Sequence, residues 1–157
     1  MHAAQRSIAV GLTVLTLSAC ASTAPESVQR AHLTQDEIAA EYAAETRRLE
    51  LAPGDTWAIA PPELTLASPD PSRPMRYEQG VGAQTAQFQW YCSWAKQALA
   101  DPEPAASLDR LAEFSSMSVW DDMDSNGHYL FSANLEDARV GDFGTLSGYV
   151  ADYCAEH

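Results

Sequence analysis

The sequence predicts a mainly α-helical protein, and two features of the chain indicate this fold most directly. The first is Gln84 to Ala100, seventeen residues without glycine or proline whose apolar positions recur at the spacing of one helix face. The second is the pair Thr34 and Glu37, which has the spacing of a capping box at the start of a helix. We therefore expect a small helical domain built around residues 84–100. The apolar positions of that helix are Phe88, Tyr91, Cys92, Ala95 and Leu99.

The capping box predicts a helix from Gln35 to about Glu50, which Pro53-Gly54 would end. Glu41 and Glu45 are spaced as i, i+4, and Arg48 follows at i+3. This spacing is typical of a salt-bridged helix face, so we expect the two carboxylates to be solvated rather than to form a catalytic pair.

Residues 53–76 form a Pro-rich segment, with six prolines between Pro53 and Pro74. This density excludes helix and disfavours central strand, so we expect an extended segment laid over the domain. Trp57, Leu64 and Leu66 are the expected anchors. The alternative is a polyproline ligand for a partner protein.

The chain after Ala100 contains further helical patterns. The prolines of 101–104 end one helix and begin a short one that carries Leu108 and Leu111. Residues 119–135 are ambiguous, because Asn126-Gly127 fits a hairpin turn as well as a break before a helix from His128 to Arg139. We favour the helix, since an isolated hairpin is marginally stable. A last helix should turn one stripe inward: Leu146, Tyr149, Val150, Tyr153 and Cys154.

Length and composition fit one modest domain. The chain has 157 residues, of which 46% are hydrophobic and 20% charged. Its net charge is −13, and its nine basic residues do not cluster beyond Arg47-Arg48. An acidic surface without a basic patch excludes a nucleic-acid partner and would be repelled by anionic lipid headgroups.

The first nineteen residues have the layout of a secretion signal, with a weakly basic start followed by an apolar run from Ile8. The run ends at Leu17-Ser18-Ala19-Cys20, which resembles the lipobox of bacterial lipoproteins. The resemblance implies cleavage before Cys20 and attachment of a diacylglycerol, with palmitate-like acyl chains, to that residue. It predicts a signal peptide over 1–19, a flexible tether over 20–32, and a single domain over 33–157. The protein would then be held on the extracytoplasmic face of the cell membrane.

Lipid attachment to Cys20 would leave two cysteines, Cys92 and Cys154, each on the inward stripe of a predicted helix. An even number in an oxidising compartment predicts one disulfide, which would stabilise a small domain by about 4 kcal/mol. The alternative is a pair of unlinked core cysteines. The body of the chain also resembles small exported actinobacterial proteins of unknown function, through the LAPGDTW, RYEQGVG and FQWYCSWAK segments. That resemblance implies no activity.

Asp122, Asp124 and Asn126 resemble the opening of an EF-hand loop, with Gly127 at the turn position. A weak calcium site is one hypothesis for these residues. We favour a solvated acidic turn, because Ala133 stands where the loop requires a bidentate glutamate. We expect no other cofactor.

Two further motifs favour ordinary structural roles. Ser93 and Lys96 match S-x-x-K, but the companion motifs of penicillin-recognising enzymes are missing. The aromatic residues of 84–100 could form a platform for a sugar or peptide, although core packing is the commoner role at helical spacing. These aromatic residues are Phe88, Trp90, Tyr91 and Trp94.

The sequence therefore predicts a membrane-anchored binding or envelope-associated module without catalytic residues, with an envelope protein or glycan as its partner. The alternative function is a cell-wall-directed hydrolase whose catalytic residues the motifs do not reveal. A buried polar cleft with two shifted carboxylates or a histidine would favour the hydrolase, whereas a closed core with one exposed apolar or acidic patch would favour binding.

Overall fold

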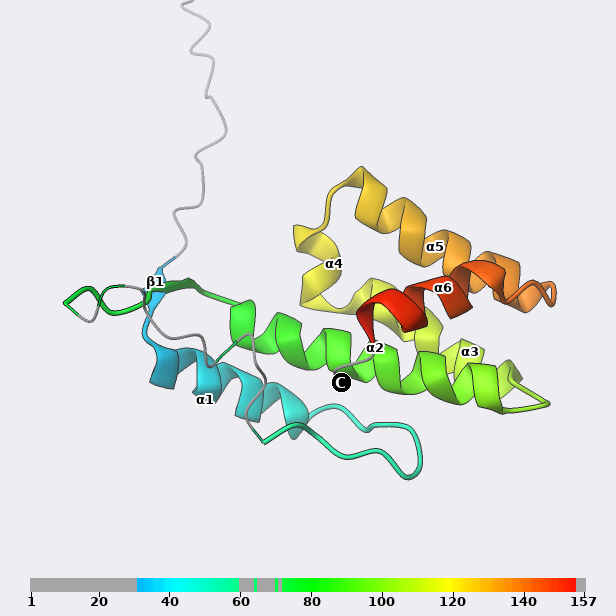
Figure 1. The fold of residues 1–157 in the computed structure, drawn as a ribbon, viewed down its shortest axis with the longest axis horizontal. Helices are drawn as coiled ribbons and strands as arrows, with labels where there is room; N and C mark the ends of the chain where they lie inside the picture. Colours follow the sequence, from blue (N-terminus) through cyan, green and yellow to red (C-terminus); the bar gives the residue numbers. More distant parts are fainter. Residues whose placement is uncertain (1–30, 60–63, 65–69, 71, 155–157) are drawn as a thin grey trace, which may run out of the picture.

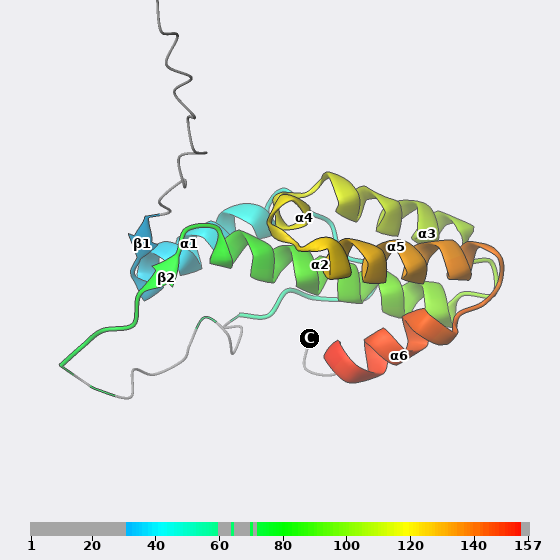
Figure 2. The same ribbon diagram turned by 90° about the horizontal axis from the view of Figure 1, so that it is seen from above.

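The computed structural model describes residues 31–59, 64, 70 and 72–154, and it confirms the mainly helical fold. Two short strands, β1 and β2, accompany the helices in the described residues (Figures 1 and 2). The strands are β1 (His32–Leu33) and β2 (Tyr77–Glu78), and the α-helices are α1 (Gln35–Thr46), α2 (Val81–Ala100), α3 (Ala105–Ala112), α4 (Ser118–Asp122), α5 (Ser125–Arg139) and α6 (Gly144–Tyr153). A short 3₁₀ helix, Glu113–Ser116, follows α3.

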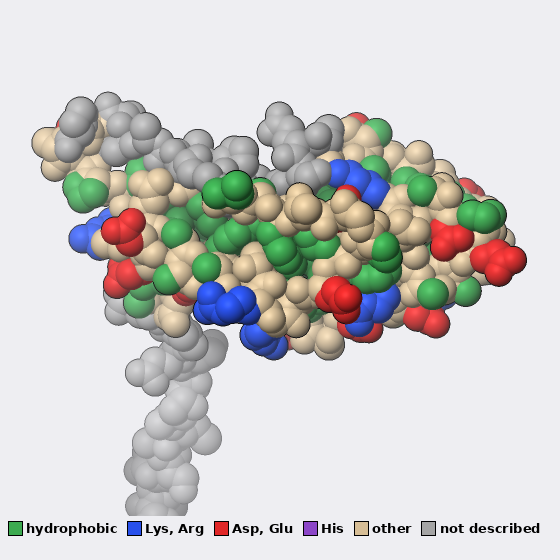
Figure 3. All heavy atoms as spheres, turned by 90° about the horizontal axis from the view of Figure 1, so that it is seen from below, with side chains coloured by type: hydrophobic (Ala, Val, Ile, Leu, Met, Phe, Trp, Pro, Cys, Tyr) green, Lys and Arg blue, Asp and Glu red, His purple; other side chains and the backbone are tan. Residues whose placement is uncertain are grey.

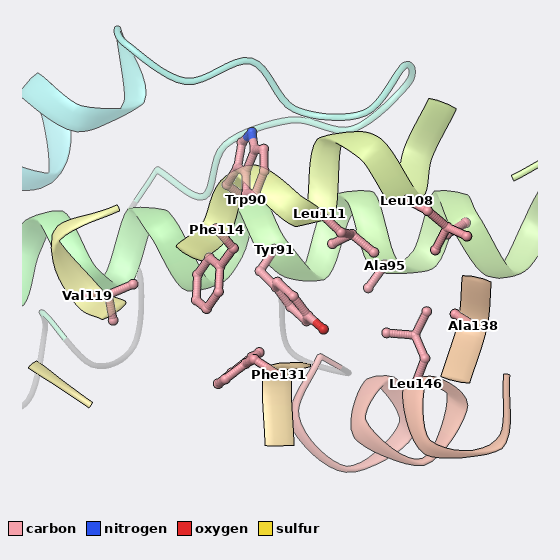
Figure 4. Close-up of a cluster of buried hydrophobic side chains, with 11 residues drawn as sticks. Trp90, Tyr91, Ala95, Leu108, Leu111, Phe114, Val119, Phe131, Ala138 and Leu146 are labelled. Atoms are coloured by element: carbon pink, nitrogen blue, oxygen red, sulfur yellow. The ribbon is translucent and has the colours of Figure 1, made fainter. Parts of the chain in front are cut away.

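Helix α2 is the axis of the molecule. Helix α1 packs along one side of it, while α3, α5 and α6 gather on the other side (Figures 1 and 2). Trp90, Tyr91 and Ala95 on α2 are at most 2% exposed. The rings of Tyr91, Phe114 and Phe131 form a triangle in which each pair of ring centroids is 4.8 Å apart (Figure 4). The prediction that this helix is surrounded by the rest of the fold is therefore confirmed.

Helix α2 begins at Val81, three residues before the predicted start, because glycine permits a sharp entry there. Gly80 adopts φ +98°, a conformation that L side chains rarely adopt. Gly82 is buried against α1, and a Cβ on it would lie 2.8 Å from the backbone nitrogen of Tyr42. The two helices therefore approach each other closely at Gly82.

Helix α1 has the predicted capping box. The Glu37 amide donates to Thr34 Oγ1, and the Thr34 amide donates to the Glu37 carboxylate. These bonds from Thr34 hold the pKa of the exposed Glu37 carboxyl below its usual value. The helix ends at Thr46 rather than near Glu50.

The prediction of a solvated, salt-bridged face on α1 is correct for the salt bridge between Glu45 and Arg48 but wrong for the solvation. Glu45 is 6% exposed and accepts from Gln87 Nε2 of α2 at 2.7 Å, as well as from Arg48 at 2.6 Å. Glu41 accepts from the amides of Gly80 and Gly82 at the start of α2. Both carboxylates therefore join helices, because a helix N-terminus and a buried amide offer donors that the α1 sequence alone does not show.

The two strands were not predicted. β1 and β2 pair antiparallel with His32 opposite Glu78 and Leu33 opposite Tyr77, and the Gln79 amide donates to the Ala31 carbonyl at 3.0 Å. This pairing places the entry of the chain into the domain beside the start of α2.

Only parts of the Pro-rich segment 53–76 are described. Trp57 is half-buried with its ring 6.3 Å from that of Tyr42, and Leu64 is 3% exposed, so both contact the domain as expected. Leu66 lies outside the described residues, as do the predicted signal, Cys20 and most of the tether.

On the side of α1, apolar side chains form a band with charged groups of both signs around it (Figure 3).

The ambiguous region 119–135 is helical. Helix α5 begins at Ser125 rather than at His128, because Asp124 Oδ1 accepts from the amides of Asn126 and Gly127 and caps it. The Asn-Gly pair therefore lies within the first turn instead of breaking the helix.

The predicted disulfide is confirmed: Cys92 and Cys154 are bonded, with their Cα atoms 5.4 Å apart. It links the end of α6 to the middle of α2. Leu146 and Cys154 are fully buried as expected, whereas Tyr153 is 64% exposed and so does not follow its predicted inward stripe. Tyr149 and Val150 lie between these extremes.

Candidate functional site: an apolar groove beside the disulfide

A groove of about 530 Å³ lies between α2, α5 and α6. None of its described lining residues carries a charge, although the chain as a whole has 22 acidic and nine basic residues. The lining residues are Thr85, Phe88, Cys92, Leu130, Phe131, Tyr149 and Tyr153. Such a groove suits the binding of an apolar group.

Helix α2 supplies one wall of the groove. Thr85, Phe88 and Cys92 stand at i, i+3 and i+7, so they share one helix face. The Thr85 hydroxyl donates to the Val81 carbonyl at 2.9 Å, so its hydrogen-bond donor is already used within the helix. This wall therefore offers a ligand a mostly apolar surface.

Aromatic rings from α5 and α6 form the opposite wall. The Tyr149 ring lies 5.2 Å from Phe131 and 5.1 Å from Tyr153, and Tyr91 backs it from the core at 5.4 Å. Burial, with a smaller effect of Tyr91 and Tyr153, raises the pKa of Tyr149 well above its usual value. The raised pKa indicates that this wall shields the Tyr149 hydroxyl from water.

The rim of the groove exposes apolar surface to solvent. Leu130 is 40% exposed and Tyr153 is 64% exposed, and the neighbouring Tyr129 is 76% exposed on α5 without lining the groove. Side chains of this kind cost free energy when left in water, so a rim that carries them is typical of a binding surface.

The disulfide forms part of the groove. Cys92 lines it and is 2% exposed, and its partner Cys154 is fully buried. The bond therefore holds the C-terminal end of α6, with Tyr153, against α2.

The aromatic platform considered as an alternative to core packing does not form as a unit. Trp90 and Tyr91 are core residues, and Trp94 faces away from the groove, where its indole donates to the Glu50 carbonyl and the Arg110 guanidinium lies 5.2 Å from its ring. Phe88 alone of the four lines the groove. Core packing is therefore the main role of these residues, as the helical spacing favoured.

The predicted calcium ligands serve other bonds. The Asp124 carboxylate caps α5, and Asp122 Oδ2 accepts from Gln84 Nε2 at 2.6 Å. The structure assigns no hydrogen bond to the Asn126 side chain, whose backbone amide donates to Asp124. Within the described ranges no three His, Cys, Asp or Glu side chains come together in a way that could hold a metal ion. The calcium site remains a prediction.

Ser93 and Lys96 line a separate, small hollow of about 190 Å³ with Gln89 and Asp55. Ser93 is buried, and its hydroxyl oxygen accepts from the Ala52 amide at 2.9 Å. The S-x-x-K serine therefore holds the loop after α1 in place, which is a structural role.

The sequence patterns do not predict the groove as a unit. Thr85 and Phe131 belong to none of the predicted inward stripes, and Tyr153, which is predicted to face inward, is 64% exposed at the rim. The adjacent apolar residues Leu130 and Phe131 are the available signal for an apolar part of α5. No local pattern, however, shows which helices meet there.

None of the helices within the described ranges combines the length and the apolar character that crossing a bilayer requires. Comparisons of the chain with protein-family models, with curated proteins and with solved structures find no match.

Proposed function

We propose that this protein is an extracytoplasmic lipoprotein, anchored to the cell membrane through Cys20, whose helical domain binds an apolar ligand without catalysing a reaction. The groove between α2, α5 and α6 is its binding site. An envelope component would supply the ligand.

The pairing of Cys92 with Cys154 is the observation that carries this proposal. The chain has three cysteines, and the disulfide uses both of those in the domain, which leaves Cys20 at the lipobox-like sequence. Disulfides persist in oxidising compartments, so the bond supports export. A lipid on the remaining cysteine would then hold the exported domain at a membrane.

The groove supports binding over hydrolysis. A hydrolase of the kind considered above needs carboxyl groups or a histidine with perturbed pKa in a cleft. The described lining of the groove contains no carboxyl group and no histidine.

Metabolic labelling with palmitate tests the anchor. The full chain should incorporate label and sediment with membranes, whereas Cys20→Ser should lose the label and appear in the soluble fraction. Ser22→Ala is the matched control, because it changes a polar residue beside the lipobox without touching the cysteine. Membrane sedimentation of unlabelled Cys20→Ser would overturn the proposed anchor.

A further inference from the structure

We propose that the groove binds one acyl chain of an uncharged lipid drawn from the bilayer that carries the anchor. This inference rests on the proposed function, because the anchor is what would bring the groove to a bilayer. Size, surface chemistry, charge and reach each support it.

The size of the groove favours a small ligand. Its volume of about 530 Å³ lies within the range of roughly 300–1,000 Å³ that is common for small-molecule sites. Seven described residues line it, whereas a standard protein interface involves roughly 20–30 residues a side. The groove is therefore too limited to seat a folded partner by itself.

The surface of the groove favours a hydrocarbon chain. Phe88, Phe131 and Tyr149 present rings, and Leu130 adds an aliphatic side chain at the rim. The Thr85 hydroxyl is already bonded to the Val81 carbonyl. A sugar ring would find few free polar partners along these walls, whereas methylene groups need none.

The negative charge of the domain favours a ligand with an uncharged headgroup. The chain carries a net charge of −13, and the groove's described lining includes no Lys, Arg or His that could pair with an anion. A fatty-acid carboxylate or a phosphate would therefore be repelled by the domain without local compensation. An uncharged head, held at the open rim near Tyr153, avoids this repulsion.

The chain upstream of the domain brings the groove within reach of the bilayer. Cys20 and Ala31 are eleven residues apart, which span at most about 36–40 Å when fully extended. The β1–β2 pair places Ala31 beside the start of α2, and the groove begins at Thr85, one turn into that helix. The anchor would therefore keep Ala31, and with it the start of α2, within about 36–40 Å of the bilayer from which the lipid is drawn.

Binding is tested with the mature chain from residue 20 that carries Cys20→Ser, so that no attached lipid competes. The uncharged dye N-phenylnaphthylamine reports occupancy by fluorescence, and monopalmitoylglycerol or palmitate displaces it. We expect monopalmitoylglycerol to displace the dye at concentrations at least about tenfold lower than palmitate, because palmitate carries a carboxylate.

Adjacent residues on α5 provide a matched pair of variants. Leu130→Asp places a charge on the rim and should weaken displacement by monopalmitoylglycerol at least about tenfold. Tyr129→Asp introduces the same charge one residue away, outside the lining, and should leave binding unchanged. Circular dichroism checks that both variants are folded, and Tyr153→Ser serves as a second groove variant if Leu130→Asp unfolds.

The outcomes separate this inference from the proposed function. Equal binding of palmitate, or equal effects of Leu130→Asp and Tyr129→Asp, would overturn the inference even if wild-type protein is lipidated. Dye that binds the Cys20→Ser chain but not the lipidated protein in nanodiscs would also overturn it, because the attached chain would then fill the groove. Mass spectrometry that finds no lipid on the wild type would instead overturn the anchor and leave the binding measurements standing.

Discussion

Glu45 Oε1 lies 2.7 Å from Nε2 of Gln87, and both side chains are almost completely buried between α1 and α2. The Gln87 oxygen in turn accepts from the Val119 amide at 2.8 Å, and its amide group also donates to Ser118 Oγ at 3.0 Å. One glutamine therefore connects three helices that are distant in the sequence.

Gln87→Leu should lower the free energy of unfolding by about 1–3 kcal/mol, because Glu45 and the Val119 amide lose a buried partner. Urea denaturation measures the change. Gln97→Leu makes the same replacement on the half-exposed part of the same helix and should have little effect. Equal midpoints for the two variants would show that the buried bonds contribute nothing net.

Gly82→Ala and Gly148→Ala should change stability in opposite directions. The methyl group at Gly82 would overlap the Ile38 carbonyl and force α1 away from α2, at a cost of about 1–3 kcal/mol. A methyl group at Gly148 on α6 meets nothing within 4 Å and should stabilise by about 0.5–1 kcal/mol through helix propensity. Thermal denaturation of both variants checks the signs, and a stable Gly82→Ala would mean that the helices separate freely.

Asp124→Ala should destabilise the protein by about 0.5–2 kcal/mol, because α5 loses its cap at Asn126 and Gly127. Asp121→Ala removes an exposed acid from the preceding helix and serves as the control. The loss should be the same with and without millimolar calcium. A calcium-dependent rise in the melting temperature of the parent that Asp124→Ala abolishes would instead establish the calcium site.

Alkaline solution should unfold the protein through its buried tyrosines. Burial raises the pKa of Tyr91 from 10.0 to about 12, and Tyr149 shifts in the same direction. The unfolded chain therefore releases these protons first, so the stabilisation is complete below pH 10 and falls as the pH rises towards about 12. Urea midpoints measured across this window should decrease, and less steeply in Tyr91→Phe. A constant midpoint would contradict the shift.

Removal of the disulfide in a Cys92→Ala, Cys154→Ala double variant should lower the free energy of unfolding by about 4 kcal/mol, because the bond closes a loop of 62 residues. It should also release the end of α6 and weaken dye binding in the groove. Hydrogen exchange would then show faster exchange in α6 than in α2. Unchanged dye binding would mean that packing alone positions Tyr153.

The helices were largely predictable because their signals are local. The period of 84–100 and the Thr34–Glu37 box are visible within a few residues, and the structure has both. The fates of Glu41 and Glu45 were not predictable from the same window. Their partners at Gly80 and Gln87 lie about 40 residues away. The residues around a carboxylate on a helix do not show which distant donor it will bind.

The groove was also beyond the reach of sequence patterns. Its walls come from three helices, and each wall contains residues that resemble ordinary core positions, such as Phe88 and Phe131. The incomplete closure between α2, α5 and α6 creates the site, and closure is a property of tertiary packing. The strands escaped prediction for a related reason, since two residues each are too short to show an alternating pattern.

The β1–β2 pair sets how mechanical load would enter the domain. Tension on the upstream chain arrives first at the Ala31 carbonyl, which holds the Gln79 amide, and then at the ladder between His32 and Glu78. These few hydrogen bonds would break before the force reached the capped end of α1 and the packed helices. If the domain hangs from the proposed anchor at Cys20, a pull on the anchor would therefore separate this pair before it disturbed the packing around the groove.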